Sequence, residues 1–181
     1  MQQIHIMAIQ ILHPKKEEYP ARFQDEIDLV FYHELIFGLE DSYKNTFAFL
    51  NNISDDKLSF RYEIGKWTIK EIWQHVMDTE RILAYRALCY SRKEIKSLPG
   101  FDEKAFAINS KANLRNWNEI IEEYSQLRSS TISLYKSFDD EMLSQIGFAG
   151  ISTIISTRAV GFLILGHELH HIEIIKERYL V

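Results

Sequence analysis

Hydrophobic residues recur at steps of three and four along four long segments of the chain. This spacing places the apolar side chains of each segment on one side of an α-helix. In the second segment, Thr68 followed by Glu71 forms the capping-box pattern with which helices begin. The pattern therefore predicts four long helices, at about residues 33–51, 68–92, 114–138 and 157–179.

The fourth predicted helix is apolar nearly all the way round, from Val160 to Ile175. A helix without a polar face is buried, whereas a helix with one apolar stripe packs that stripe against partners. Four long helices of these two kinds bury their apolar surfaces best as a bundle with one contiguous core. The expected fold is therefore an all-α four-helix bundle.

The three connections differ in length and composition. Residues 52–66 form a short bridge that can hold one helical turn, and residues 93–113 form a crossover long enough to span the bundle. Residues 144–156 fit either a small hairpin or a plain loop. No repeat or domain boundary is visible, so we expect one domain over 1–181, with an N-terminal arm at 1–30 and the bundle at about 31–180.

Composition agrees with a helical globular protein. The 181 residues are 46% hydrophobic and 26% charged, with only 7 glycines and 3 prolines, which fits long regular elements with few turns. The formal net charge of -5 provides no basic surface for a nucleic-acid backbone. A nucleic-acid partner is therefore disfavoured.

Cysteine content and hydropathy indicate a cytoplasmic protein. Cys89 is the single cysteine, which fits a reducing compartment, and its apolar helical neighbours favour a buried structural thiol over a nucleophile. Residues 1–12 lack the basic leader and the cleavage site of a signal peptide. No run of about 20 apolar residues appears, so we expect no membrane partner.

The strongest chemical signal is the segment Gly166-His167-Glu168-Leu169-His170-His171-Ile172. On a helix, His167 and His171 lie on one face about 5–6 Å apart, so their rings can bind one ion. Hydrogen bonds to tyrosine or carboxylate side chains are the other way to satisfy such buried imidazoles. The spacing of the pair in a buried helix favours metal binding.

A third ligand is needed, because a catalytic site usually has three protein ligands and one open position. His75 in the second predicted helix is the best candidate, since a bundle brings inward residues of different helices into one layer. His170 is rotated by about 60° from His167 and about 100° from His171 on the helix. It is therefore a weak candidate, as are His5, His13 and His33.

The segment also matches H-E-x-x-H, the zinc-peptidase pattern in which the glutamate is the general base. The extended form of that pattern requires glycine and histidine where this chain has Ile174 and Glu177. A zinc peptidase is therefore the least favoured alternative.

Further segments accompany these histidines. They are Gly65-Lys66-Trp67-Thr68-Ile69-Lys70-Glu71-Ile72-Trp73-Gln74-His75, Asp78-Thr79-Glu80-Arg81-Ile82, Tyr85-Arg86-Ala87-Leu88 with Arg92, Leu98-Pro99-Gly100-Phe101-Asp102, Arg128, and Glu177-Arg178-Tyr179. The whole pattern, from about Pro14 to Leu180, resembles the DinB-like (DinB/YfiT) superfamily of small bacterial metal-dependent enzymes.

The resemblance implies a four-helix bundle with a long crossover between helices 2 and 3. It implies a three-histidine site for a divalent metal ion, zinc or nickel, with the ligands here His75, His167 and His171. It also implies a homodimer and a small-molecule substrate. Some relatives transfer low-molecular-weight thiols such as bacillithiol or mycothiol to electrophiles, and others are described as metal-dependent hydrolases or isomerases.

Such a site has a definite chemistry. Three neutral imidazoles leave the charge of the ion uncompensated, so a bound thiol is acidified, and the pKa of a bound water falls towards about 7. The expected function is thus a metal-dependent hydrolase or thiol S-transferase. The alternative is a non-enzymatic, metal-stabilised module for binding or stress response. A histidine-only site does not select strongly among zinc, nickel, copper and iron.

Several residues near His75 in the sequence have more than one plausible role. Glu71 and Asp78, at i-4 and i+3, are candidates to accept a ring N–H of His75, but a helix cap or a solvated charge is as common. Arg81, Arg86 and Arg92 are candidates to steer an anionic substrate, although salt bridges are the commoner use of arginine. Trp67 and Trp73 are expected to pack.

Overall fold

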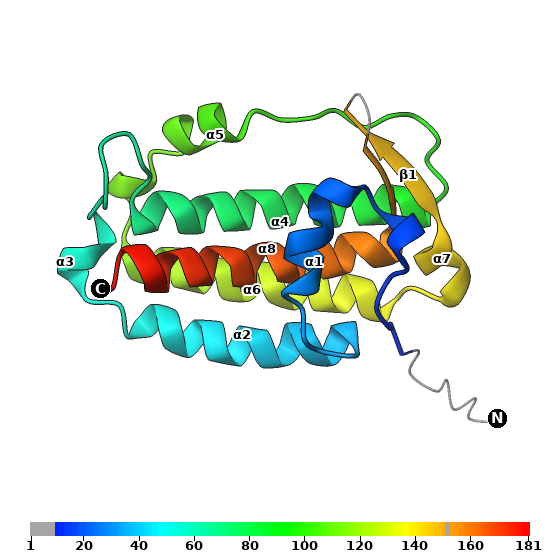
Figure 1. Cartoon of the computed structure of the whole chain (residues 1–181), viewed down its shortest axis with the longest axis horizontal. Helices are drawn as coiled ribbons and strands as arrows, with labels where there is room; N and C mark the ends of the chain where they lie inside the picture. Colours follow the sequence, from blue (N-terminus) through cyan, green and yellow to red (C-terminus); the bar gives the residue numbers. More distant parts are fainter. Residues whose placement is uncertain (1–9, 151–152) are drawn as a thin grey trace.

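The computed structural model describes residues 10–150 and 153–181. The expectations for His5 and for the first nine residues of the N-terminal arm lie outside these ranges. Four long helices form a bundle, which confirms the predicted fold class (Figure 1). They are α2 (Leu35–Asn51), α4 (Ile69–Ser91), α6 (Trp117–Lys136) and α8 (Thr157–Arg178).

Shorter elements fill the connections. The connection after α6 contains an antiparallel hairpin in which Ile146 pairs with Ser156, so the hairpin alternative was the right one for this segment. The 3-10 turns are Lys16–Glu18, Ala21–Phe23 and Ala112–Leu114. The other elements are α1 (Gln24–Asp28), α3 (Asp55–Leu58), α5 (Glu103–Asn109), α7 (Asp140–Ser144), β1 (Ile146–Ala149) and β2 (Thr153–Ser156).

The crossover between α4 and α6 runs back along the bundle, so that both helices point in the same direction (Figure 1). It carries α5 over the outer side of α4. Among the described residues, no helix is both long and apolar enough to cross a membrane. The long crossover predicted from the sequence is thus present.

Helix α8 lies in the interior, as its all-round apolar character predicts. Phe162 and Leu165 in its first half are fully buried, and so is Ile175 in its second half. Trp73 of α4 is fully buried too, whereas Trp67 is only half-buried. Cys89 packs against the core but is only half-buried, less than the buried thiol that the sequence predicts, and its structural role stays a prediction.

The start of α4 is held by the predicted capping box. The Thr68 hydroxyl accepts a hydrogen bond from the Glu71 N–H at 3.1 Å, and the Glu71 carboxylate accepts one from the Thr68 N–H at 2.8 Å. These bonds satisfy N–H groups that a helix start otherwise leaves free. The cap fixes where α4 begins, and with it the position of His75 two turns into the helix.

A buried polar network joins all four long helices. Arg128 of α6 donates two hydrogen bonds to Glu80 of α4, at 3.0 and 2.8 Å, and one to Glu168 of α8 at 2.6 Å. Glu168 also accepts hydrogen bonds from Ser42 of α2 and Tyr124 of α6, at 2.7 and 2.8 Å. All three charged side chains are at most 2% exposed.

Burial lowers the pKa of Arg128, but attraction to Glu168 and Glu80 outweighs burial, and the net pKa lies well above the usual value. The guanidinium therefore stays charged in the core.

Candidate metal centre

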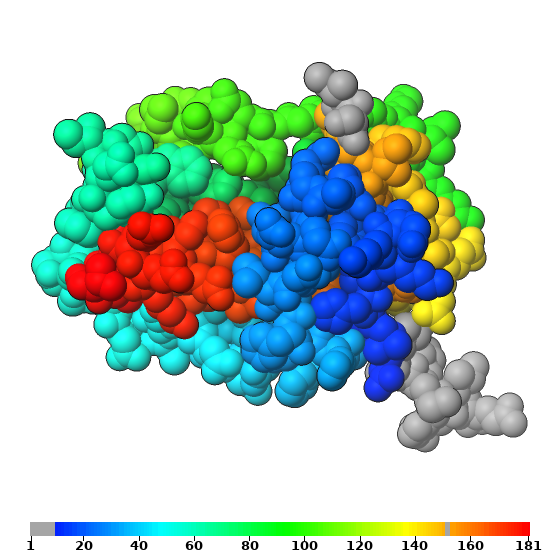
Figure 2. Space-filling view, viewed as in Figure 1, coloured from blue at the N-terminus to red at the C-terminus, as the bar shows by residue number. Residues whose placement is uncertain are grey.

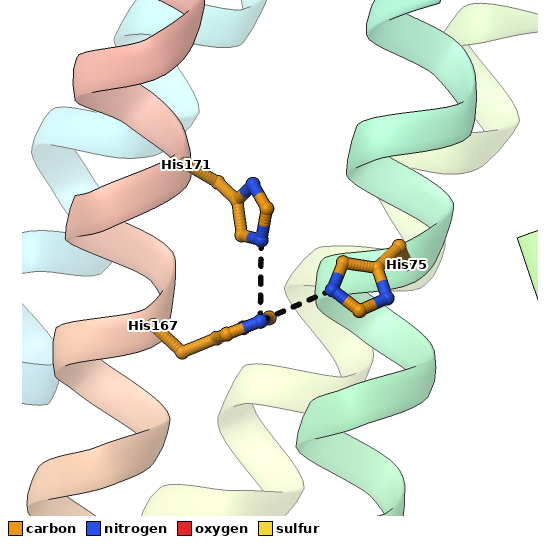
Figure 3. Close-up of side chains that lie close together, drawn as sticks. All are labelled: His75, His167 and His171. Atoms are coloured by element: carbon orange, nitrogen blue, oxygen red, sulfur yellow. Dashed lines mark hydrogen bonds between the residues drawn. The ribbon is translucent and has the colours of Figure 1, made fainter. Parts of the chain in front are cut away.

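Three histidine rings from two helices converge at one point. The Nε2 atom of His167 lies 3.1 Å from Nε2 of His75 and 3.2 Å from Nε2 of His171 (Figure 3). One ligand atom from each ring lies within 4.8 Å of the other two. The structure thus brings together the three residues predicted as metal ligands, from α4 and α8.

The local sequence explains this convergence. His167 and His171 are one turn apart on α8, and both point towards α4, the helix with which α8 makes its largest contact. His75 sits at the edge of the apolar stripe of α4, yet it is only 4% exposed. The side of α4 that carries His75 is buried because α8 packs against it.

The other described histidines have different surroundings. His13 contacts the Tyr32 carbonyl oxygen through its Nε2 at 2.8 Å and packs on the ring of Phe162. His33 is exposed. His170 lies beside His171 but outside the cluster, as its rotation on the helix predicts.

All three clustered rings are neutral at pH 7. Burial lowers the pKa of His75 to about 4. Burial, with the neighbouring His75 and His170, lowers the pKa of His171 to about 3. The pKa of His167 also falls well below its usual value, mainly through burial. Each ring therefore offers an unprotonated nitrogen, which is the form that binds metal ions.

Hydrogen bonding alone does not satisfy the three Nε2 atoms. A neutral imidazole has one N–H group and one nitrogen lone pair. Nε2 of His167 is therefore either a donor or an acceptor, and it can make one well-aligned hydrogen bond in the plane of the ring. It faces two other Nε2 atoms at hydrogen-bond distance. At least one of these contacts is left without a well-made hydrogen bond, whereas a cation between the three lone pairs satisfies all of them.

The spacing of the nitrogens also suits a metal ion. Two nitrogens bound to zinc at 2.0–2.1 Å with a tetrahedral angle are about 3.3 Å apart. The observed separations of 3.1 and 3.2 Å are close to this value. The residues present therefore fit a divalent ion.

The outer nitrogen of His75 faces Thr79, whose hydroxyl lies 3.5 Å from Nδ1. Glu71 instead binds the helix start and Arg61, and Asp78 binds Gln74 at 2.9 Å. The cap interpretation of Glu71 is confirmed, and neither carboxylate contacts the His75 ring. Thr79 was not predicted as a partner of His75, although its i+4 spacing from His75 is a usable signal.

Glu168 does not belong to the site. Its carboxylate is fully buried in the core and bonded to Arg128, Ser42 and Tyr124, and its described hydrogen bonds include none to the three clustered histidines. A general base must reach the reacting proton, and this carboxylate does not. The geometry therefore contradicts the zinc-peptidase alternative.

A cavity of about 320 Å³ opens onto all three clustered histidines. Figure 2 shows the surface hollowed where the crossover, α1 and α8 meet. Trp67 and Phe101 form aromatic walls, and Arg86 and Glu26 contribute charged groups. A small organic molecule fits in this volume and can reach the histidines.

Gly166, which precedes His167, allows α1 to cross α8. A Cβ atom at this position would lie only 2.0 Å from the backbone oxygen of Glu26 in α1. Glycine is therefore required for the close approach, and the approach brings Glu26 to the wall of the cavity.

We expect Gly166→Ala to destabilise the protein by about 1–3 kcal/mol, because backbone atoms must move to relieve the clash. For a chain of this length the melting temperature would fall by roughly 2–12 °C. Thermal unfolding followed by circular dichroism measures the effect. Glu173→Ala, at an exposed position of α8, is the matched control and should melt like the wild type. An unchanged melting temperature in Gly166→Ala would show that α1 does not pack on the glycine.

Comparisons with known proteins identify a family and a shared fold. The family model DinB_2, described as the DinB superfamily, matches residues 39–175. A protein of Oceanobacillus iheyensis named putative metal-dependent hydrolase is 26% identical over 144 residues, which cover 80% of this chain and 83% of that protein.

Two solved structures share the fold. One is YfiT from Bacillus subtilis, described as a probable metal-dependent hydrolase with an unusual four-helix bundle topology. It matches with a TM-score of 0.60 and 15% identity, over 92% of this chain and 93% of YfiT. The other is the mycothiol-dependent maleylpyruvate isomerase, which matches with a TM-score of 0.57 and 10% identity, over 83% of this chain and 59% of that chain.

Proposed function

The chain belongs to the DinB superfamily, and we propose that it is a metal-dependent enzyme acting on a small molecule, with His75, His167 and His171 as the ligands of a divalent ion. The observation that carries this proposal is the convergence of three neutral imidazoles, with one ligand nitrogen from each ring within 4.8 Å of the other two. Zinc and nickel are the ions that we propose for the site.

An enzyme is favoured over a metal-stabilised structural module by what surrounds the cluster. Among the described residues, no fourth histidine, cysteine, aspartate or glutamate joins the group. The cluster opens onto the 320 Å³ cavity instead of being closed by protein. Structural metal sites usually have four protein ligands, whereas catalytic sites keep one position open.

The residues around the cluster hold its geometry. Thr79 lies near Nδ1 of His75, and the ring of Trp67 packs against the His75 ring with centroids 4.9 Å apart. These two contacts restrict the rotation of His75 so that its Nε2 faces α8. Trp67 and Phe101 also line the cavity with apolar surface.

The reaction that we propose is attack of an activated water or thiol on an electrophilic small molecule. A divalent ion held by neutral imidazoles supplies the acidification of either nucleophile. The name of the Oceanobacillus iheyensis relative supports hydrolysis. Thiol transfer is the second candidate, supported by the fold shared with a mycothiol-dependent isomerase. The homodimer and the cytoplasmic location stay predictions from the sequence.

We expect untagged protein to carry about one divalent ion per chain in plasma mass spectrometry. Zinc-loaded, nickel-loaded and metal-free protein are then assayed for hydrolysis of p-nitrophenyl acetate and for conjugation of L-cysteine to monochlorobimane. At least one of these reactions should proceed with the loaded protein and fall to background after chelation.

Two results would contradict the enzyme. Failure to retain zinc or nickel after reconstitution would exclude the metal site. A retained ion with neither reaction, together with unfolding on chelation, would support the structural module instead.

A further inference from the structure

Arg86 differs from the other two arginines that the sequence analysis considered for substrate binding. Arg81 forms an ion pair with Glu123 at 2.5 Å. Arg92 contacts Ser91 and Met142 near the far end of α4. Of the three, only Arg86 lines the cavity that contains the histidines.

The guanidinium of Arg86 has spare hydrogen-bonding capacity. Its one hydrogen bond among the described residues runs from Nη2 to the Pro99 carbonyl oxygen at 3.0 Å, and no described carboxylate lies within 4 Å of it. A guanidinium carries five N–H donors. The side chain is half-buried, and burial lowers its pKa. A partly desolvated cation without a counterion attracts an anion.

The position of Arg86 suits a residue that anchors one end of a molecule. It follows His75 by eleven residues on α4, which corresponds to about 16.5 Å along the helix axis. Side chains on a helix lean towards its N-terminus, so Arg86 leans towards the level of His75. Both residues line the same cavity, together with the aromatic rings of Trp67 and Phe101.

The two carboxylates that line the cavity do not pair with Arg86. Glu26 and Glu103 both line the cavity. Burial, together with repulsion from Glu103 and Asp25, raises the pKa of Glu26. Neither Glu26 nor Glu103 forms an ion pair with Arg86 in the described structure, and neither contributes to its pKa shift. Among the described lining residues, Arg86 is therefore the one arginine or lysine, and it is not paired with either carboxylate. The two carboxylates make a second negative charge on a bound molecule unfavourable.

We propose that Arg86 determines substrate specificity by binding the carboxylate of a small organic acid, whose opposite end then reaches the three histidines. Arginine matches a carboxylate with two parallel hydrogen bonds. A single unpaired arginine, with two carboxylates elsewhere in the cavity, suits a singly charged carboxylate better than a doubly charged phosphate. The binding of a carboxylate by Arg86 does not depend on the proposed function. Only the reaction of the opposite end of the molecule at the histidines rests on it.

The test uses metal-free protein, so that the probes have no ion to bind. Isothermal titration calorimetry compares 3-phenylpropionate with 3-phenylpropionamide, its uncharged counterpart of the same shape, and with 3-phenylpropylamine. We expect the acid to bind at least about tenfold more tightly than the amide, since hydrogen bonds between charged groups are the stronger ones. The phosphate monoester 2-phenylethyl phosphate should bind more weakly than the acid.

Variants locate the preference. Arg86→Met should bring the acid-to-amide affinity ratio close to one, and Arg86→Lys should retain part of it. Arg81→Met is the matched control on the same helix and should keep the ratio of the wild type. The ratio compares two probes in the same variant. If loss of the Pro99 contact loosens the crossover, both affinities change together, so a change in the ratio still reports on the charge of residue 86.

Several outcomes would overturn the inference. Two concern the acid itself: no binding at millimolar concentration, or an affinity equal to that of the amide. Two concern the other probes: tighter binding of the phosphate than of the acid, or tighter binding of the amine than of the acid, which would assign recognition to Glu26 and Glu103. The last is a preference for the acid that survives in Arg86→Met. Failure of the metal site is a separate result, because a chain that retains no ion can still show the acid preference.

Discussion

His167→Ala should reduce the metal content from about one ion per chain to nearly none. His167 is the central member of the cluster, because its Nε2 is the atom that lies within 3.2 Å of both other Nε2 atoms. Loss of an outer partner of a metal ligand already costs about 10–100-fold in affinity, so loss of the ligand itself should cost more than about 100-fold. Plasma mass spectrometry after dialysis against limiting zinc measures the effect.

His75→Ala tests whether two helices share the ion. If the site is the one proposed, this variant on α4 loses the metal as His167→Ala on α8 does. His170→Ala is the matched control, because His170 neighbours His171 on the same helix and lies outside the cluster. Retention of the ion in His75→Ala, or its loss in His170→Ala, would show that the ligands are not the three proposed.

Arg128→Met should be the most destabilising of the single substitutions considered. It leaves Glu80 and Glu168 buried, at 2% and 0% exposure, without their cation. Breaking a buried ion pair in this way costs about 3–5 kcal/mol. For a chain of this size the melting temperature should fall by roughly 6–20 °C. Urea unfolding followed by circular dichroism gives the free energy.

Two further variants test whether the loss of stability in Arg128→Met comes from uncompensated buried charges. Arg61→Met breaks the ion pair with Glu71, in which the arginine is 43% exposed, and a surface pair contributes at most about 1 kcal/mol. The triple variant Arg128→Met, Glu80→Gln, Glu168→Gln removes both uncompensated charges and should recover much of the lost stability. If Arg128→Met were no less stable than Arg61→Met, the network would not be buried as described.

The network also explains why the H-E-x-x-H pattern is misleading here. Residues adjacent on a helix point about 100° apart, so His167 faces the cavity while Glu168 faces the neighbouring part of the core. There Glu168 meets Arg128, Tyr124 and Ser42. The same residue types that form a peptidase centre in one tertiary setting hold helices together in another.

The sequence by itself determined the features that depend on local spacing. The periodicity of apolar residues specified four helices, Thr68 and Glu71 specified where α4 begins, and the four-residue spacing specified that His167 and His171 share a face. Each of these follows from the geometry of a single helix. Bundle geometry offered His75 as the third candidate ligand, and the resemblance carried by the longer motifs identified the family and implied the same residue.

Only the tertiary structure decided the features that depend on how helices are rotated and placed against each other. It turned the His75 edge of α4 towards α8, it directed Glu168 into the core, and it brought α1 over Gly166 to close one side of the cavity. It also left Arg86 without an ion pair while Arg81 found one. Helical spacing says which residues share a face, but the partner of that face is set by long-range packing of the whole bundle.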